Sequence, residues 1–273
     1  WGSPIRVTVE EGYNVVNNDR IIQTSSGRLI APVSFTRDVG KPDFVSYVDY
    51  SDDEGKTWRS SSPSLRAPLR GAMEPGVAEL EPGRLLMIIR TRTGFIYRSE
   101  SRDDGSTWSV ATATDIVSPE SPATLKRIPD TDHLLLIWNN NPEAREDFRA
   151  QRAPLTAAIS TDGGKTWGEP VDVEPDTSRA YAYASALSVK NDVLLTYYDS
   201  VKWDQGLSLR FRRLPLDALY GSRKPRERDR VTPRTSESRG SGRARRACAA
   251  APPREGPKNS RSPRAGGWCA AFR

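Results

Sequence analysis

Short apolar runs of about five to eight residues recur along the first 221 positions and alternate with polar, turn-forming stretches. Clear examples are RLLMIIR at 84–90, HLLLIWN at 133–139 and VLLTYYD at 193–199. Such runs, rich in branched and aromatic side chains and bounded by Gly, Asp, Asn or Pro, are typical of β-strands. Helical spacing of apolar residues is almost absent, so the pattern predicts an all-β protein.

The expected strands come in sets that surround a repeated motif. The motif Ser-x-Asp-x-Gly-x-Thr-Trp occurs at 51–58, 101–108 and 160–167, each time after three apolar runs and before a more polar one. Its Asp can accept backbone N–H groups of a tight turn, its Gly permits a positive φ, and its Trp supplies a large apolar group. Trp1 begins WGSP and resembles the end of another copy, since TWGEP at 166–170 continues in the same way. Four-stranded repeats in series predict a β-propeller, with about four blades in this chain.

Charge divides the chain into two parts. Residues 222–273 hold 15 Lys and Arg against 4 Asp and Glu, a net +11 in a chain whose total is +6, which leaves −5 for residues 1–221. The basic balance therefore belongs to the end and does not predict nucleic-acid binding. This end is rich in Arg, Pro, Ser and Ala, and we expect it to be a disordered tail. A reading-frame artefact is the interpretation we favour for it, over a linker or a basic binding segment.

Few residues are available for metal or thiol chemistry. Cys248 and Cys269 both lie in the tail, and the single histidine, His133, is expected in a surface turn. Together with the structural use of the motif aspartates, this predicts no metal site and no cofactor. No apolar run approaches the roughly 20 residues of a membrane helix, and the first residues resemble neither a signal nor a transit peptide. Localisation and oligomeric state stay open.

Longer segments resemble bacterial sialidases, glycoside hydrolases built on a six-bladed β-propeller. MEPGVAELEPGRLLMIIRTRTGFIYRSESRDDGSTW at 73–108 resembles the segment with the catalytic glutamate and second substrate-binding arginine, which implies Glu74 and Arg90. RAPLTAAISTDGGKTW at 152–167 is similar to the segment of the third arginine, which implies Arg152. YAYASALSVKNDVLLTYYD at 181–199 resembles the segment of the tyrosine nucleophile, which we assign to Tyr183, with Tyr181 as second choice. The resemblance covers residues 1–221.

The residue types suit the chemistry that this resemblance implies. Sialic acid carries a carboxylate on its reacting carbon, and guanidinium groups such as those of Arg90 and Arg152 bind carboxylates through paired, charge-assisted hydrogen bonds. A neutral tyrosine is not repelled by that carboxylate, as an Asp or Glu nucleophile would be. A free tyrosine has a pKa of about 10, so Glu74 would accept its proton as general base. The expected partner is a sialylated or other acidic glycan.

Each assignment has a plainer alternative. Glu74 could be a solvated carboxylate before Pro75, Arg90 could form an ion pair at a strand end, and Tyr183 could simply pack within a blade. VVNNDRII at 15–22 places Asp19 and Arg20 just before a predicted strand, where they could contact substrate or form a structural pair. The alternative for the whole protein is a non-catalytic carbohydrate-binding or scaffolding propeller, and a hydrolase of another acidic sugar is a third interpretation.

The chain also departs from the family pattern. It has no early Arg-Ile-Pro segment with the first arginine of the triad, because KRIP at 126–129 lies in the wrong blade, and no early aspartate to act as general acid. Without an acid, the first step loses a factor of roughly 10²–10⁴. We therefore expect an active exo-α-sialidase-like parent and a nearly inactive fragment, and an incomplete ring with unpaired strands predicts poor solubility.

Overall fold

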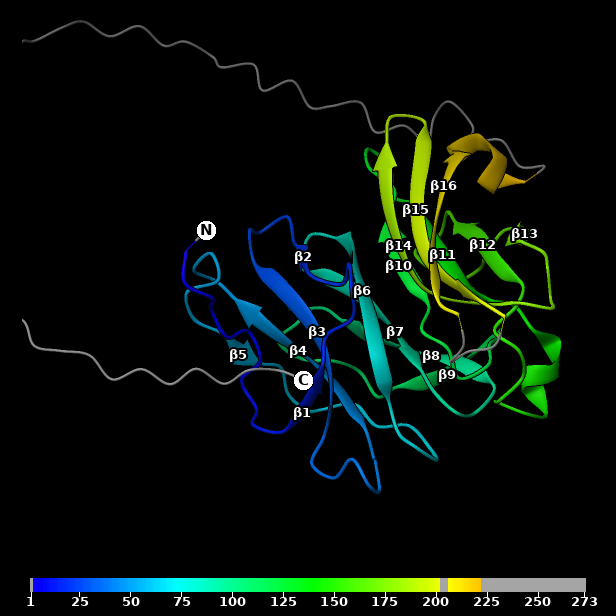
Figure 1. Ribbon diagram of the computed structural model, residues 1–273. Helices are drawn as coiled ribbons and strands as arrows, with labels where there is room; N and C mark the ends of the chain where they lie inside the picture. Colours follow the sequence, from blue (N-terminus) through cyan, green and yellow to red (C-terminus); the bar gives the residue numbers. More distant parts are fainter. Residues whose placement is uncertain (1, 202–205, 222–273) are drawn as a thin grey trace, which may run out of the picture. The chain divides into compact units, whose positions relative to one another are not determined.

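The computed structural model describes residues 2–201 and 206–221, which form an all-β protein (Figure 1). Within these residues the strands make four antiparallel sheets that follow one another along the chain, here called blades 1 to 4. The predicted propeller arrangement with four blades in this chain is therefore confirmed. Residues 222–273, with the tail predicted for them, lie outside the described residues.

The strands of each blade are consecutive in the sequence. Blade 1 contains β1 (Tyr13–Val15), β2 (Ile22–Gln23), β3 (Leu29–Thr36), β4 (Val45–Ser51) and β5 (Arg59–Ser60). Blade 2 contains β6 (Met73–Glu81), β7 (Arg84–Arg90), β8 (Phe95–Ser101) and β9 (Thr112–Val117). Blade 3 contains β10 (Thr124–Arg127), β11 (Leu134–Asn139), β12 (Leu155–Ser160) and β13 (Val171–Glu174). Blade 4 contains β14 (Ala180–Val189), β15 (Asp192–Ser200) and β16 (Ser208–Pro215).

Two short 3₁₀ helices complete the described chain. η1 spans Pro142–Arg145 in the polar loop between β11 and β12, and η2 spans Leu216–Tyr220 after β16. None of the helices in the described residues is long and apolar enough to cross a membrane.

The first strand of blade 1 is interrupted. β1 pairs with the end of β3 and β2 pairs with its beginning, both antiparallel, so residues 16–21 between them leave the sheet edge. We call residues 16–21 the bridging segment. Its side chains bond to blades 3 and 4, as described below.

The three Ser-x-Asp-x-Gly-x-Thr-Trp motifs close the hairpins that end β4, β8 and β12. In the first copy, Asp53 accepts hydrogen bonds from the Thr57 backbone N–H (2.8 Å) and from Ser51 Oγ (2.8 Å), and Gly55 has a φ of +86°. These bonds lower the pKa of Asp53 to about 2, the backbone bond from Thr57 contributing most. The Trp58 indole N–H donates to the Gly55 carbonyl at 3.0 Å. The structural role predicted for the motif residues is therefore what the geometry shows.

The second and third motif turns also rest on the preceding blade. Arg28 of blade 1 donates Nη1 to the Asp104 carbonyl of the second turn (2.9 Å), and Arg98 of blade 2 donates Nη1 to the Gly164 carbonyl of the third (2.7 Å). A methyl group at Gly105 would lie 3.0 Å from Cδ1 of Ile30 in blade 1. The turns thus lock successive blades together.

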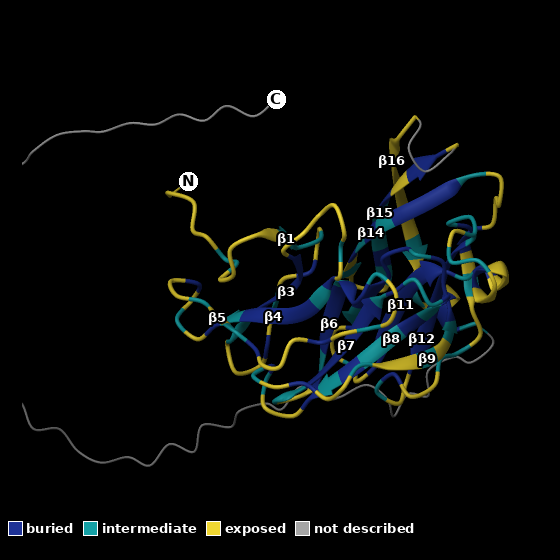
Figure 2. Ribbon diagram, turned by 90° about the horizontal axis from the view of Figure 1, so that it is seen from below, coloured by how far each residue is buried: buried dark blue, intermediate teal, exposed yellow. Residues whose placement is uncertain are grey.

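Apolar side chains on both faces of the sheets form the core between blades. Leu86 and Ile88 of blade 2 share a cluster with Leu134 and Leu136 of blade 3, and equivalent clusters join blades 1 and 2 and blades 3 and 4. Burial of each such side chain contributes about 1.5–3 kcal/mol to the free energy of folding. Figure 2 shows the buried strands in the middle of the molecule and the exposed β16 of blade 4.

His133 is not the surface residue that its turn sequence predicted. Only 4% of it is exposed, and its Nδ1 lies 2.7 Å from the hydroxyl of Tyr220 in η2. The sequence prediction failed because the covering element comes from 87 positions later in the chain. The buried pair attaches η2 to blade 3.

Candidate active site

Three blades bring together the four residues assigned from the sequence to catalysis and carboxylate binding. Glu74 lies at the start of β6, Arg90 ends β7 beside it, and Tyr183 lies near the start of β14. The Tyr183 hydroxyl donates to Glu74 Oε1 at 3.1 Å, and Arg90 Nη1 pairs with Glu74 Oε2. Arg152 precedes β12, and its charge acts on Tyr183 and Glu74. Residues 109 positions apart in the sequence therefore share one polar cluster.

The strands that carry Glu74 and Tyr183 are both irregular at these positions. The register of β6 shifts between Met73 and Gly76, and that of β14 shifts between Ala182 and Ser185. Glu74 has a φ of +41° and Tyr183 a φ of +56°, a region that residues other than glycine rarely adopt. Bulges and strained backbone of this kind re-aim side chains and concentrate at functional sites.

The bulge in β14 separates the two candidate tyrosines. Tyr181 is 1% exposed and packs edge-on against Tyr197, with ring centroids 6.1 Å apart, inside the core between blades 3 and 4. Tyr183 instead contacts Glu74, which makes it the better candidate nucleophile of the two. Burial and the charge of Glu74 raise the pKa of the Tyr183 phenol above its ordinary value, while the charges of Arg90 and Arg152 oppose the increase.

Arg152 is held through its backbone and its side chain. Its carbonyl accepts from Asn139 Nδ2 (2.8 Å) and from the Tyr181 N–H (2.9 Å), and its Nη2 donates to the carbonyl of Glu120 (2.8 Å). Burial and the like charge of Arg90 lower the pKa of Arg152 to about 10, so its guanidinium is still protonated at neutral pH. Because the two guanidinium groups repel each other, an anion bound by both of them would be stabilised electrostatically.

The sequence assignments missed Glu120, which lies just before β10. Its carboxylate accepts from Arg70 Nη1 (2.9 Å) and Arg92 Nε (2.8 Å) and lies 3.4 Å from Arg90 Nη2, with 12% of the side chain exposed. Burial opposes its ionisation, but the charge of Arg90 and the bonds from Arg92 and Arg70 lower its pKa. A single acidic residue between two prolines, in SPESP at 118–122, was the signal available in the sequence.

The bridging segment places Asp19 and Arg20 beside the cluster. Asp19 pairs with Lys126 at 2.7 Å, and this bond together with the Ala186 N–H lowers its pKa against the opposing effect of burial. Arg20 is 3% exposed and donates to the Ala123 carbonyl (2.8 Å) and Thr124 Oγ1 (3.2 Å). Asp19 thus has Lys126 as its ion-pair partner, and contact of Asp19 or Arg20 with substrate stays a prediction.

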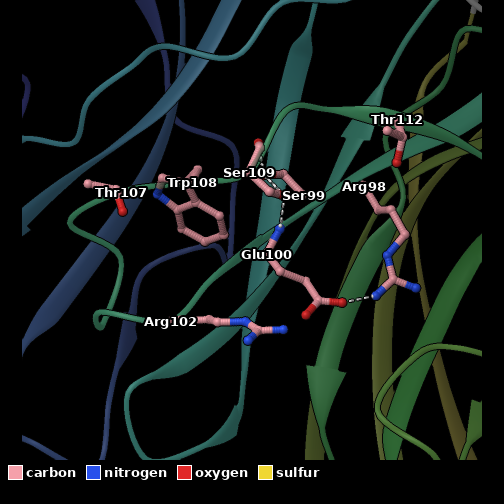
Figure 3. Close-up of a pocket in the computed structure, with 8 residues that line it drawn as sticks. All are labelled: Arg98, Ser99, Glu100, Arg102, Thr107, Trp108, Ser109 and Thr112. Carbon is pink, nitrogen blue, oxygen red and sulfur yellow. Dashed lines mark hydrogen bonds and ion pairs between the residues drawn. The ribbon is translucent and has the colours of Figure 1, made fainter.

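Two surface clefts lie apart from this cluster. One, of about 500 Å³, is lined by Arg98, Glu100 and Trp108 at the end of blade 2 where the second motif turn lies (Figure 3). Arg98 Nη2 donates to Glu100 Oε1 at 2.5 Å, so those two charges satisfy each other. The other, of about 590 Å³, lies on blade 1 around Tyr47 and Lys41. Neither cleft includes a residue of the Glu74 cluster.

The described residues contain no group of three His, Cys, Asp or Glu arranged to hold a metal ion. A carboxylate 3.1 Å from a phenol can accept its proton, and two guanidinium groups can hold a carboxylate beside it.

Comparisons with known proteins identify the family of the chain. A family model described as BNR repeat-like domain matches residues 1–195. A sialidase of Bacteroides fragilis (strain YCH46) is 27% identical over 211 residues, covering 73% of this chain and 37% of that protein. A sialidase of Micromonospora viridifaciens is 30% identical over 171 residues, covering 59% of this chain and 25% of that protein.

Solved structures show the same fold. The NanB sialidase from Streptococcus pneumoniae, in complex with 2-[(3-chlorobenzyl)ammonio]ethanesulfonate, superposes with a TM-score of 0.63 at 22% identity, over 80% of this chain and 33% of that one. Trypanosoma rangeli sialidase in complex with the inhibitor DANA superposes with a TM-score of 0.58 at 21% identity, over 74% of this chain and 32% of that one.

Fold and matches define the class as a sialidase-type β-propeller. The chain belongs to the BNR repeat-like domain family, within the sialidase superfamily of glycoside hydrolases. It spans about a quarter to two fifths of the length of the two curated relatives.

Proposed function

We propose that the cluster of Glu74, Tyr183, Arg90 and Arg152 belongs to the active centre of a retaining exo-α-sialidase-like glycosidase. Its substrate class is a glycan that ends in sialic acid or a related acidic sugar. The observation that carries the proposal is the 3.1 Å bond from the Tyr183 hydroxyl to a Glu74 carboxylate that also pairs with Arg90.

The mechanism assigns one task to each residue. Arg90 and Arg152 hold the carboxylate of the sugar, which fixes the anomeric carbon beside Tyr183. Glu74 accepts the phenolic proton as the Tyr183 oxygen forms a bond to the anomeric carbon and the aglycone oxygen leaves with the bonding electrons. Water then attacks the anomeric carbon from the face that the aglycone left, and the departing Tyr183 oxygen takes its proton back from Glu74. The two inversions give overall retention. Asp19, whose side chain is 28% exposed, is the better placed of the two bridging residues for an additional polar contact with the sugar.

The longer relatives motivate a further part of the proposal. We infer that the first arginine and the general acid of the family come from a parent protein that extends beyond this sequence. Without an acid to protonate the leaving oxygen, this chain would hydrolyse ordinary sialosides roughly 10²–10⁴-fold more slowly than its parent. A fluorogenic sialoside assay of the chain checks this, and a parent-like rate would contradict it.

Carboxylate recognition is tested by titration calorimetry of the chain with N-acetylneuraminic acid. Arg90→Gln and Arg152→Gln should each weaken binding at least tenfold, which corresponds to about 1.4 kcal/mol. The matched control is Arg149→Gln, because that arginine is exposed and pairs only with Asp147 next to it. The methyl ester of the sugar, which lacks the negative charge, should bind poorly. Equal binding of acid and ester would refute the arginine assignment.

The nucleophile is tested with a glycosyl fluoride of sialic acid that carries a second fluorine at C3. Fluoride leaves without protonation, so the reaction does not require the missing acid. We expect one covalent adduct on the peptide that contains Tyr183, detected by mass spectrometry, and none in Tyr183→Phe. Sugar binding without labelling would favour the alternative, a carbohydrate-binding propeller without catalysis.

A further inference from the structure

The bridging segment reaches the bulge that carries Tyr183 with three successive side chains. Asn18 Nδ2 donates to the Tyr183 carbonyl at 3.1 Å, and Asp19 Oδ2 accepts from the Ala186 N–H at 2.9 Å. Arg20 Nη1 donates to Thr124 Oγ1 at 3.2 Å, and that hydroxyl donates to the Ala184 carbonyl at 2.6 Å. Asn18 and Asp19 thus bond directly to β14 at Tyr183 and Ala186, and Arg20 acts on Ala184 through Thr124 of blade 3. These positions lie in or next to the stretch where the register of β14 shifts.

These contacts replace bonds that the sheet cannot supply. At the bulge, Tyr183 and Ala184 have no register partner on β15, since pairing jumps from Ala182 to Ser185. A backbone polar group that is buried without a partner costs about 1–3 kcal/mol, so an irregular strand needs partners from elsewhere. Asn18 provides one for the Tyr183 carbonyl from 165 positions earlier in the chain, and Thr124, itself bonded by Arg20, provides one for the Ala184 carbonyl.

The segment is itself fixed at both sides. Lys126 of blade 3 donates Nζ to the carbonyl and to the carboxylate of Asp19, at 2.8 and 2.7 Å. The side chain of Arg20 passes β6, where a methyl group at Gly76 would lie 3.7 Å from its Cδ. Asp19 has a φ of +57°, a further strained residue in the same neighbourhood. The segment therefore touches the strands of both Glu74 and Tyr183.

We propose that Asn18, Asp19 and Arg20 are positioning residues that clamp the Tyr183 bulge and so keep the phenol within hydrogen-bond distance of Glu74. The clamp explains why the first strand of blade 1 is split into β1 and β2: the residues between them leave their own sheet to bond to another blade. The inference rests on the proposed role of Tyr183 for its catalytic meaning, but its geometry can be tested without turnover.

The test compares Asn18→Ala and Asp19→Ala in the full chain by NMR. The first readout is hydrogen exchange of the Ala186 amide, which should become at least tenfold faster in Asp19→Ala because its acceptor is lost. The second is titration of tyrosine labelled at Cζ, with the Tyr183 signal identified by its absence in Tyr183→Phe. In both variants the phenol pKa should fall toward the ordinary value of 10.0, as the ring leaves its buried position beside Glu74.

Two matched variants separate positioning from general destabilisation. Asn14→Ala removes an asparagine of the same strand region that bonds to the Glu10 and Gly12 carbonyls and accepts from the Tyr47 hydroxyl. None of these partners lies in blades 2 to 4, so the variant should leave the Tyr183 titration unchanged. Asp19→Asn keeps an oxygen for the Ala186 N–H and should retain slow exchange. An unchanged Tyr183 titration in both alanine variants, or an equal shift in Asn14→Ala, would overturn the clamp. Failure of the labelling experiment above would instead affect only the proposed catalysis.

Discussion

At the scale of single residues, the site depends on how its charges are balanced. Arg90 pairs with two carboxylates, Glu74 on one side and Glu120 on the other. Glu120 also bonds to Arg70 and Arg92, and its carbonyl accepts from Arg152. Glu120 therefore orients both guanidinium groups that would bind an anion, Arg90 through its carboxylate and Arg152 through its carbonyl, while the cluster stays net positive.

Replacing Glu120 should expose this dependence. Glu120→Gln leaves three neighbouring arginines without their shared counter-charge, and we expect a loss of about 3 kcal/mol at pH 7. This is the lower end of the range for a broken buried pair, because Arg70 and Arg92 are 30% and 35% exposed. Denaturant unfolding measures the loss, and Glu81→Gln, at an exposed pair with Arg84, is the matched control.

The contribution of Glu120 should also depend on pH. Its folded-state pKa lies below the unfolded value, so the stabilisation is complete above the unfolded pKa, about 4.3, and is lost as the pH falls through the folded pKa. The difference in unfolding free energy between wild type and Glu120→Gln should therefore be constant from pH 5 to 7 and shrink below pH 4. A difference that grows on acidification would contradict the assigned charge state.

Part of this candidate site could be predicted from the sequence, and part could not. Glu74 and Arg90 are sixteen positions apart on adjacent strands, so a local segment was enough to pair them. Glu120 was not identified because its arginine partners are distant in the sequence and no local pattern encodes those contacts. Asp19 and Arg20 were noticed, but the sequence could not indicate that they bond to the strand of Tyr183.

At the scale of elements, the motif turns have two roles, closing a hairpin and resting on the preceding blade. The sequence predicted the first role from Asp, Gly and Trp, and the strands between the turns followed from apolar runs. It did not predict the split of the first strand of blade 1, or η2 covering His133, because both depend on contacts between distant parts of the chain.

Alanine substitutions at two glycines should distinguish the contact with the preceding blade from the backbone requirement of a turn. Gly105 and Gly83 have φ values of +85° and +79°, so alanine at either position costs about 1–2 kcal/mol of backbone strain. A methyl group at Gly105 also meets Ile30 and Leu85 at 3.0–3.1 Å, whereas none of the described atoms lies within 4 Å of one at Gly83. Gly105→Ala should therefore destabilise by about 1–3 kcal/mol more than Gly83→Ala in thermal or denaturant unfolding. Equal losses would show that contact with blade 1 contributes nothing.

At the scale of the whole molecule, blade 4 ends in an exposed strand. β16 is the last strand of its sheet in the described part of the chain, and its Leu209 and Phe211 are 69% and 64% exposed. An edge strand that exposes large apolar side chains invites pairing with another chain. Poor solubility stays a prediction, and β16 is the surface to which we assign it.

Replacing the exposed apolar side chains of β16 with lysines should reduce self-association of the chain. We expect the chain to form concentration-dependent oligomers, and the double variant Leu209→Lys/Phe211→Lys to shift the population toward monomer in sedimentation velocity. Val110→Lys serves as the control, since Val110 is 83% exposed but lies outside the strands. A wild-type chain that is monomeric at all concentrations would refute this assignment.

The contacts of the motif turns with the preceding blade also set an order for the loss of structure. Blades 2 and 3 each have a turn of their own resting on the blade before them, and blade 2 also receives the turn of blade 3 through Arg98. Unfolding of blade 2 or blade 3 must therefore break the contacts with both adjacent blades. Blade 1 or blade 4 can separate after the contacts with one adjacent blade are broken. Amide protons of β7 and β11 should consequently be the slowest in the chain to exchange with solvent, and structure should be lost from the terminal blades inward.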